Sequence, residues 1–143
     1  MSHRSLEDGR ADCGPDAARL HLKAVIAGLA ELLVGSSETV GWLQFVTREL
    51  REPGPAFEIL YDTLWRPGVE LITRLIVRIV GNSQEDAVAR IQALLLISSV
   101  LSFQSGRSIS LRAMQWTAIG RKEVTQILAV INGQIDAIGR TQS

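Results

Sequence analysis

The sequence is poor in the residues from which catalytic and metal centres are commonly built. Two histidines and one cysteine occur among the 143 residues. His3 lies near the N-terminus and His21 lies early in the chain, so a histidine metal site or a catalytic triad would be difficult to assemble. Cys13 is expected to be an ordinary exposed thiol, and no GxxxxGKS or GxxxxGKT phosphate loop is present. We therefore expect a protein that is not an enzyme and that uses no metal and no cofactor.

An excess of charge of one sign is also lacking. The 15 Lys and Arg residues balance the 15 Asp and Glu residues, so the formal net charge is zero. Nucleic acid is bound by clustered basic surfaces. Because the basic residues are scattered, we expect no nucleic acid to bind through this chain alone. A lone cysteine cannot form an intrachain disulfide, and residues 1–15 lack the apolar core of a signal peptide. These absences favour a cytoplasmic protein.

Aromatic residues make up only 5% of the chain, whereas 46% of its residues are hydrophobic, which is typical of aliphatic helical bundles. No strand-like alternation or internal repeat occurs. The spacing of apolar residues predicts an all-α bundle of five to six helices in residues 16–143, after a flexible tail in residues 1–15. Asp16 and Ser83 are the expected caps of the first and fourth helices. The predicted helices are residues 16–34, 38–51, 55–80, a helix from Ser83 through 91–103, a short helix around 110–116, and 120–139.

The longest apolar stretch is Ile91–Phe103, and no formally charged residue occurs between Arg90 and Arg107. On a helix its apolar side chains would point in all directions, so it needs apolar partners on every side. These partners are other helices of the chain or the same helix of a second copy. A membrane span needs about 18 or more continuous apolar residues. This stretch is shorter and contains three serines and a glutamine, so we interpret it as a buried central helix and expect no membrane insertion.

Pro67 lies inside the third predicted helix. It lacks a backbone N–H and crowds the carbonyl of Thr63, so it should bend or split the helix near Trp65. Such a bend opens space against the core and is a candidate wall for a pocket. On the exposed side of this helix, we expect two ion pairs between residues four positions apart, Asp62–Arg66 and Glu70–Arg74.

Glu49 shares one side of the second helix with Trp42 and Phe45, so its carboxylate is expected to be partly buried. A buried carboxylate requires a cation or hydrogen-bond donors. Two interpretations stay open. Glu49 is either a structural tie, for instance to an arginine of the third helix, or the polar anchor of a ligand in an apolar pocket. The same choice between core packing and ligand contact applies to Tyr61, Trp65, Phe103 and Trp116.

The last helix carries two stripes suited to contact with another helix. One is apolar with 3-4-3 spacing, and the other is a ridge of small residues that permits close approach of two backbones. The stripes consist of Leu128, Ile131, Ile135 and Ile138, and of Ala129, Gly133 and Ala137.

The stretch Trp42–Phe57 resembles the regulatory domain of TetR-family transcriptional regulators, most closely the CecR-like subgroup. The matching features are, in order, Arg48-Glu49, the break Pro53-Gly54-Pro55, and Arg66-Pro67. The resemblance extends, less specifically, over residues 20–139.

This resemblance implies a homodimer that binds a small hydrophobic or amphipathic effector. In that family the last two long helices of each subunit form a four-helix interface, and the effector pocket lies among the middle helices. Transferred by position, the interface residues would be Leu94, Ile97, Leu101, Leu128, Ala129, Ile131, Gly133, Ile135 and Ala137. The ligand-binding residues would be Phe45, Glu49, Tyr61, Trp65, Phe103 and Gln104.

TetR-family proteins carry a helix-turn-helix domain before this region, and residues 1–41 do not have its pattern. A recognition helix needs basic and polar residues that reach phosphates and base edges, whereas residues 16–34 predict an apolar core helix. We expect either a fragment of a longer regulator or a relative that retained only sensing and dimerisation. The expected function is that of an effector-sensing, homodimerising regulatory domain. The alternative is a structural helical interaction module without a ligand.

Overall fold

The structure, a computed structural model, describes residues 14–34, 37–81 and 86–140, and within these ranges every regular element is helical. The elements are α2 (Pro15–Ala30), the 3-10 helix η1 (Glu31–Val34), α3 (Ser37–Arg51), α4 (Phe57–Leu60), the π-helix η2 (Tyr61–Trp65), α5 (Arg66–Val80), α6 (Asp86–Ser105), α7 (Arg107–Met114) and α8 (Arg121–Ala137). The predicted all-α bundle is confirmed. The predicted tail, up to residue 13, and the predicted cap Ser83 lie outside the described residues.

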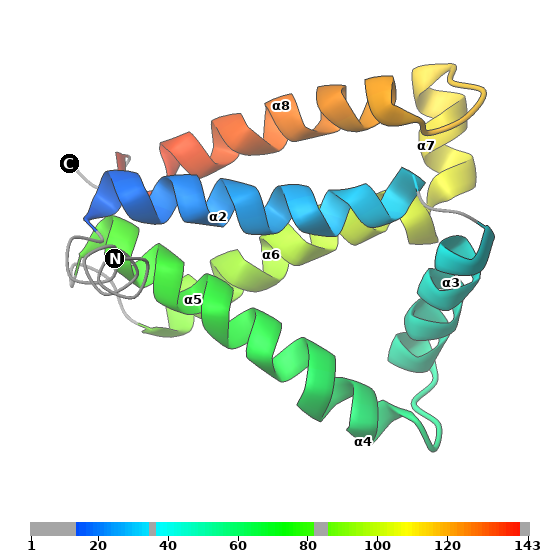
Figure 1. The fold of residues 1–143 in the computed structure, drawn as a ribbon, viewed down its shortest axis with the longest axis horizontal. Helices are drawn as coiled ribbons and strands as arrows, with labels where there is room; N and C mark the ends of the chain where they lie inside the picture. The colour runs from blue at the N-terminus through cyan, green and yellow to red at the C-terminus, as the bar shows by residue number, and fades with distance from the viewer. Residues whose placement is uncertain (1–13, 35–36, 82–85, 141–143) are drawn as a thin grey trace, which may run out of the picture.

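The bundle is arranged around α2, which runs through its middle (Figure 1). In this view α8 and α5 lie on either side of α2 and α6 lies behind it, and all three contact α2. α5 and α6 also pack against each other. α3 stands at one end of the molecule, where it contacts η1, α6 and α4. α8 is held mainly by α2 and η1, so its position depends on few neighbours.

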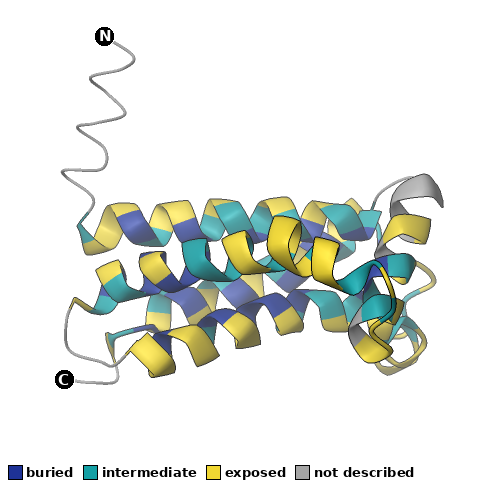
Figure 2. Ribbon diagram, turned by 90° about the horizontal axis from the view of Figure 1, so that it is seen from below, coloured by how far each residue is buried: buried dark blue, intermediate teal, exposed yellow. Residues whose placement is uncertain are grey.

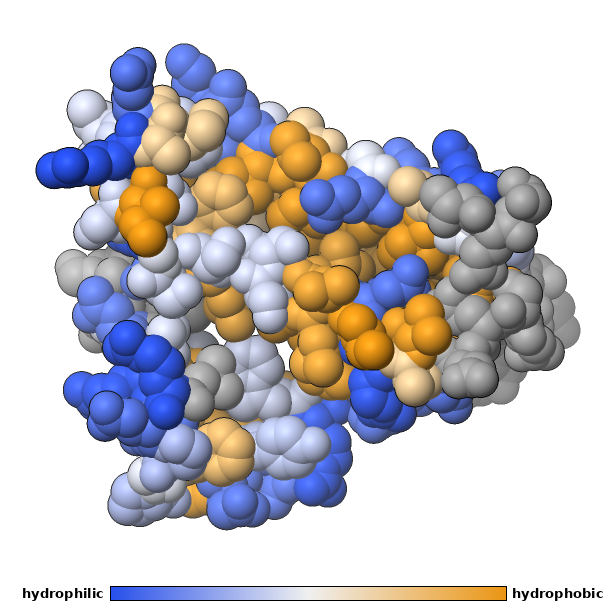
Figure 3. Space-filling view, turned by 180° about the vertical axis from the view of Figure 1, so that it is seen from behind, coloured by the Kyte–Doolittle hydropathy of each residue, from blue (hydrophilic) through white to orange (hydrophobic). Residues whose placement is uncertain are grey.

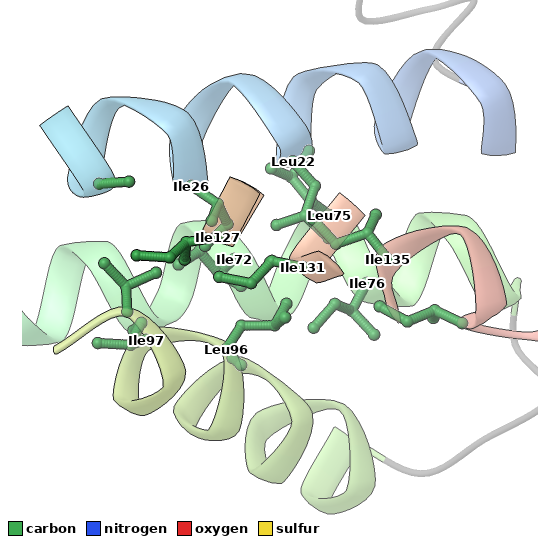
Figure 4. Packing of buried hydrophobic residues seen from close by; sticks show 14 of the residues in the cluster. Leu22, Ile26, Ile72, Leu75, Ile76, Leu96, Ile97, Ile127, Ile131 and Ile135 are labelled. Carbon is green, nitrogen blue, oxygen red and sulfur yellow. The ribbon is translucent and has the colours of Figure 1, made fainter. Parts of the chain in front are cut away.

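The core is an aliphatic cluster to which α2, α5, α6 and α8 each contribute one stripe (Figure 4). Buried residues recur along the inward side of each helix and exposed residues along the outward side (Figure 2). Leu22 and Ile26 of α2, Ile76 of α5 and Ile135 of α8 have no exposed surface. Along each helix the buried residues recur three or four positions apart, which places them on one side, as the sequence pattern predicts.

The rod formed by α4, η2 and α5 changes geometry where Pro67 was expected to disturb it, so this prediction is confirmed. Residues Tyr61–Trp65 form a π-helix, whose wider turns contain hydrogen bonds between residues five apart. α5 begins at Arg66, with Pro67 in its first turn. The first turn of a helix has unpaired N–H groups in any case, so a proline is tolerated there.

Two local predictions are wrong and one is confirmed. The N-cap of α2 is Gly14, whereas Asp16 lies in the first turn, where the helix dipole favours an acid. The ion pair Asp62–Arg66 is present, with Oδ1 and Nη2 2.9 Å apart. Glu70 pairs with Arg90 of α6, at 2.9 Å between Oε1 and Nη1, and not with Arg74. The packing of α5 against α6 brings Arg90 within reach, which a single-helix pattern cannot show.

Candidate ligand cavity and exposed apolar face

An apolar cavity of about 400 Å³ lies between α2, α3, α5 and α6, beside η2. This volume falls within the range of small-molecule sites, about 300–1,000 Å³. These helices lie between residues 15 and 105, so the cavity exists only in the packed bundle. Its walls are Val25, Leu29 and Leu32 from α2 and η1, Trp42 and Val46 from α3, Leu64, Trp65, Gly68 and Ile72 from η2 and α5, and Ile97 and Leu101 from α6.

Gly68 accounts for part of the empty space. A Cβ atom built at this position would meet no heavy atom within 4 Å. Gly68 lies about one turn after Leu64 and directly follows Pro67, so the apolar side of the rod has a gap where it faces the bundle. The predicted pocket wall near Pro67 did not include Gly68. The signal that could have found it is a glycine interrupting an apolar helical stripe.

Among the described residues, no charged side chain lines the cavity. The polar groups in its walls are the indole N–H groups of Trp42 and Trp65. The Nε1 atom of Trp65 is buried and has no hydrogen-bond partner among the described residues. An unpaired buried donor costs about 1–3 kcal/mol, a cost that an acceptor atom within hydrogen-bond distance of this indole would remove. These walls fit an uncharged, mainly apolar ligand.

The structure does not bring the six predicted ligand-binding residues together. Trp65 lines the apolar cavity. Phe103 lines a groove between α6 and α8, and Gln104 lines a separate polar cavity beside α7. Phe45 lies beneath the guanidinium group of Arg48, 5.8 Å from the ring centre. Tyr61 stacks on Phe57, outside the apolar cavity.

Glu49 forms a hydrogen bond whose partner could not be identified from the sequence. Its Oε1 atom accepts a hydrogen bond from the backbone N–H of Gly54, 3.1 Å away. A Cβ atom on residue 54 would lie 3.1 Å from the carboxylate, so the close approach favours glycine. The hydrogen bond joins the end of α3 to the loop that leads to α4. It corresponds to the predicted tie, with the backbone of Gly54 as partner in place of the expected arginine.

A second feature is an apolar face that α6 and α8 leave uncovered (Figure 3). On α6, Ile91, Leu94 and Leu95 are exposed, and Leu95 retains 61% of its accessible surface. On α8, Val130 retains 65%. The helix that the sequence describes as apolar on all sides is therefore buried on one side and open on the other.

The predicted interface residues divide between this face and the core. Leu94, Ala129, Gly133 and Ala137 are exposed, and Leu101 and Leu128 are half-buried. Ile97, Ile131 and Ile135 are only 6%, 3% and 0% exposed within the single subunit. These three side chains already pack in the core cluster of the single subunit, so a contact between them and a partner stays a prediction.

α6 is also, within the described ranges, the one helix with the length and composition to cross a membrane. Core helices of soluble proteins can have the same length and composition. Ala93, Leu96 and Val100 of α6 are buried against the rest of the bundle.

No group of three or more His, Cys, Asp or Glu side chains in the described part of the chain could hold a metal ion.

Comparison with known proteins gives a family match over most of the chain. The family described as "HTH-type transcriptional dual regulator CecR, C-terminal domain" matches residues 18–140. The HTH-type transcriptional dual regulator CecR of Shigella flexneri is 26% identical over 106 residues, which cover 74% of this chain and 48% of that protein. The chain thus spans about half the length of this relative. The family match runs from α2 to the end of α8 and includes both the apolar cavity and the exposed face.

Proposed function

This chain belongs to the family of CecR C-terminal domains of TetR-type transcriptional regulators, and we propose that it is the effector-sensing and homodimerising part of such a regulator. The single observation that supports sensing best is the apolar cavity beside the π-helix η2. The proposed effector is uncharged and mainly apolar, because the walls carry aliphatic and indole groups. A cytoplasmic location is part of this proposal, since transcriptional regulators act on DNA.

The proposed mechanism is a shift between two helix arrangements. A ligand shifts such an equilibrium only by its difference in affinity for the two states. α3 and the rod of η2 and α5 both form walls of the cavity, so an effector that fills it changes their preferred separation. In a dimeric regulator this change would alter the distance between two DNA-binding heads. The π-turns at Tyr61–Trp65 are where we expect the rod to yield, since π-bulges are common at functional sites.

Binding to the cavity is tested with the neutral apolar fluorophore N-phenyl-1-naphthylamine. We expect saturable fluorescence enhancement and a higher melting temperature, because a ligand at about 100 times its dissociation constant adds about 2.7 kcal/mol of stability. The Gly68→Leu variant should lose this response, since its side chain occupies the empty space at the wall. It should fold at least as stably as the wild type, because glycine inside a helix costs about 0.5–1 kcal/mol relative to alanine.

The matched control is Gly28→Leu, the same substitution on α2 at an exposed position where a Cβ atom also has open space. It should bind the fluorophore as the wild type does. Equal binding by Gly68→Leu and wild type would contradict the assignment of this cavity.

Dimerisation is proposed through the exposed apolar face of α6 and α8. A large contiguous apolar surface on a soluble protein commonly marks an interface. Gly133→Leu should weaken the dimer by about tenfold or more, or about 1.4 kcal/mol, because the new side chain separates two helices that approach closely. Sedimentation velocity measures the change, with Gly28→Leu again as control. A wild-type chain that remains monomeric at every concentration would exclude the proposal.

The alternative is a structural interaction module that dimerises and binds no effector. The exposed face of α6 and α8 is compatible with this function, but the apolar cavity would then have no role. A dimer that responds to no neutral apolar compound in a broad thermal-shift screen would favour the alternative.

A further inference from the structure

A second cavity, polar and of about 460 Å³, lies between α3, the end of α6 and the start of α7. It is distinct from the apolar cavity, although α3 forms a wall of both. Trp42 faces the apolar cavity and Arg51 the polar one. These residues are about two and a half helical turns apart, which places them on opposite sides of α3.

The polar cavity has two cationic side chains in its walls and no acidic one among the described residues. Arg51 comes from α3 and Arg107 from α7. Within residues 14–34, 37–81 and 86–140, neither guanidinium group forms an ion pair. Two arginines that share a cavity without an acid repel each other, and a bound anion would remove this repulsion.

Arg107 is held in place by a buried side chain. Its Nη1 atom donates a hydrogen bond to Oε1 of Gln104, 3.1 Å away, and Gln104 is only 6% exposed. Burying an amide is costly unless it is hydrogen-bonded. Gln104 thus fixes the guanidinium group at the cavity wall, which lowers the entropy that a ligand contact would cost.

Further donors converge on the same space. Ser108 lines the cavity, and α7 begins there. Ser105 also lines it, but its hydroxyl donates to the carbonyl oxygen of Leu101, 3.3 Å away. No side chain among the described residues caps the start of α7, which follows Gly106. The first turn of a helix carries unpaired N–H groups and a partial positive charge, both of which favour anions. Hydroxyl groups and guanidinium forks bind oxyanions with directed hydrogen bonds.

We propose that this polar cavity binds the oxyanion group, phosphate or carboxylate, of a small molecule. The site goes beyond the proposed apolar effector and occupies the opposite side of α3. Occupancy draws Arg51 toward Arg107 and thereby fixes α3 against the junction of α6 and α7. Because α3 is also a wall of the apolar cavity, an anion bound here acts on the same helix as the apolar effector.

The test is isothermal titration of the full chain with inorganic phosphate and, separately, with acetate, at constant ionic strength maintained with sodium chloride. We expect saturable binding of at least one of them, and the stronger anion defines the ligand class. Arg51→Gln and Arg107→Gln should each weaken binding by about tenfold or more, which corresponds to losing one charge-assisted hydrogen bond. Arg112→Gln is the matched control, an exposed arginine of α7 that does not line the cavity; its affinity should match that of the wild type.

Ser108→Glu keeps both arginines and introduces a competing carboxylate. The new acid lies in the first turn of α7, where the helix dipole favours it, so the fold should be retained, as circular dichroism would show. Binding should fall at least as far as in Arg107→Gln. Absence of saturable binding in the wild type, or binding that is equal in all variants, would overturn the proposal. Binding of N-phenyl-1-naphthylamine is measured on the same variants, so a failure here is separate from a failure of the apolar site.

Discussion

Replacing Ile135 with alanine is expected to lower the free energy of unfolding by about 2–4 kcal/mol, within the range found for large-to-small substitutions in close-packed cores. Ile135 has no exposed surface and belongs to the stripe through which α8 packs on α2. Its truncation removes apolar contacts and leaves a cavity that the surrounding helices fill only in part. Urea denaturation followed by circular dichroism measures the effect.

The substitution also separates a core role from an interface role. If Ile135 lies in the subunit core, the loss relative to wild type is the same at two well-separated protein concentrations. If it lies between subunits, the loss changes with concentration, because association contributes to the stability of a dimer. Leu94→Ala is the matched control on the exposed face of α6. It should leave subunit stability nearly unchanged and weaken self-association. A concentration-dependent loss for Ile135→Ala would contradict the structure.

The ends of several helices could be predicted because glycine and proline begin or end a helix through local effects. The sequence predicted a helix over residues 38–51, and α3 spans Ser37–Arg51. The third helix was expected to end at Gly81, and α5 ends at Val80 with Gly81 at a φ of 70°. A positive φ is available to glycine without steric cost. The π-turns that precede Pro67 lie where its missing N–H group interrupts the helical hydrogen-bond pattern, which is also a local effect.

The partner of each apolar stripe could not be predicted in the same way. The 3-4-3 spacing on the last helix shows that Ile131 and Ile135 face something apolar, but it does not identify the surface that covers them. In the structure both side chains are buried in the core cluster of the same subunit, whereas Leu95 of α6 is exposed. Helical periodicity indicates which side of a helix is buried, but it does not indicate whether the helix that covers this side belongs to the same subunit.

The apolar cavity lies where several helices leave space between them, and the residue pattern of a single helix does not show such a space. Trp65 was predicted near Pro67 and lines the cavity, whereas Val25 and Leu29 lie in residues 16–34, which the sequence predicts only as an apolar core helix. Glu49 was considered as a ligand anchor because it shares a side of α3 with Trp42. Its carboxylate instead accepts a hydrogen bond from Gly54, a contact that requires the path of the chain after α3 to be known.

Arg19→Met is expected to lower the free energy of unfolding by about 2–3 kcal/mol, as hydrogen bonds from a charged donor are worth about 1.5–3 kcal/mol and are not additive. The guanidinium group of Arg19 on α2 donates to the carbonyl oxygens of Ile135, Asp136 and Ile138, at 2.6, 3.1 and 2.9 Å. It pairs the carbonyl oxygens of Asp136 and Ile138 and adds a second donor to that of Ile135, which also accepts from the N–H of Ile138. Its charge complements the helix dipole at this end of α8. Chemical denaturation of both proteins measures the loss.

Lys23→Met is the matched control for the same helix pair, because Lys23 forms an ion pair with Asp136 at 2.8 Å between Nζ and Oδ1. The hydrogen bond from Lys23 holds the pKa of Asp136 below its ordinary value. A depressed carboxyl pKa contributes stability above the unfolded pKa, and this contribution is lost as the pH falls through the folded pKa. Lys23→Met should therefore cost less than Arg19→Met at neutral pH, and its cost should disappear in acid. Most of the cost of Arg19→Met should persist, because backbone carbonyl groups do not titrate; only the weaker Coulomb attraction by which Arg19 also lowers the pKa of Asp136 is lost in acid. Equal losses with the same pH dependence would show that Arg19 acts only as a general positive charge near α8, not as its cap.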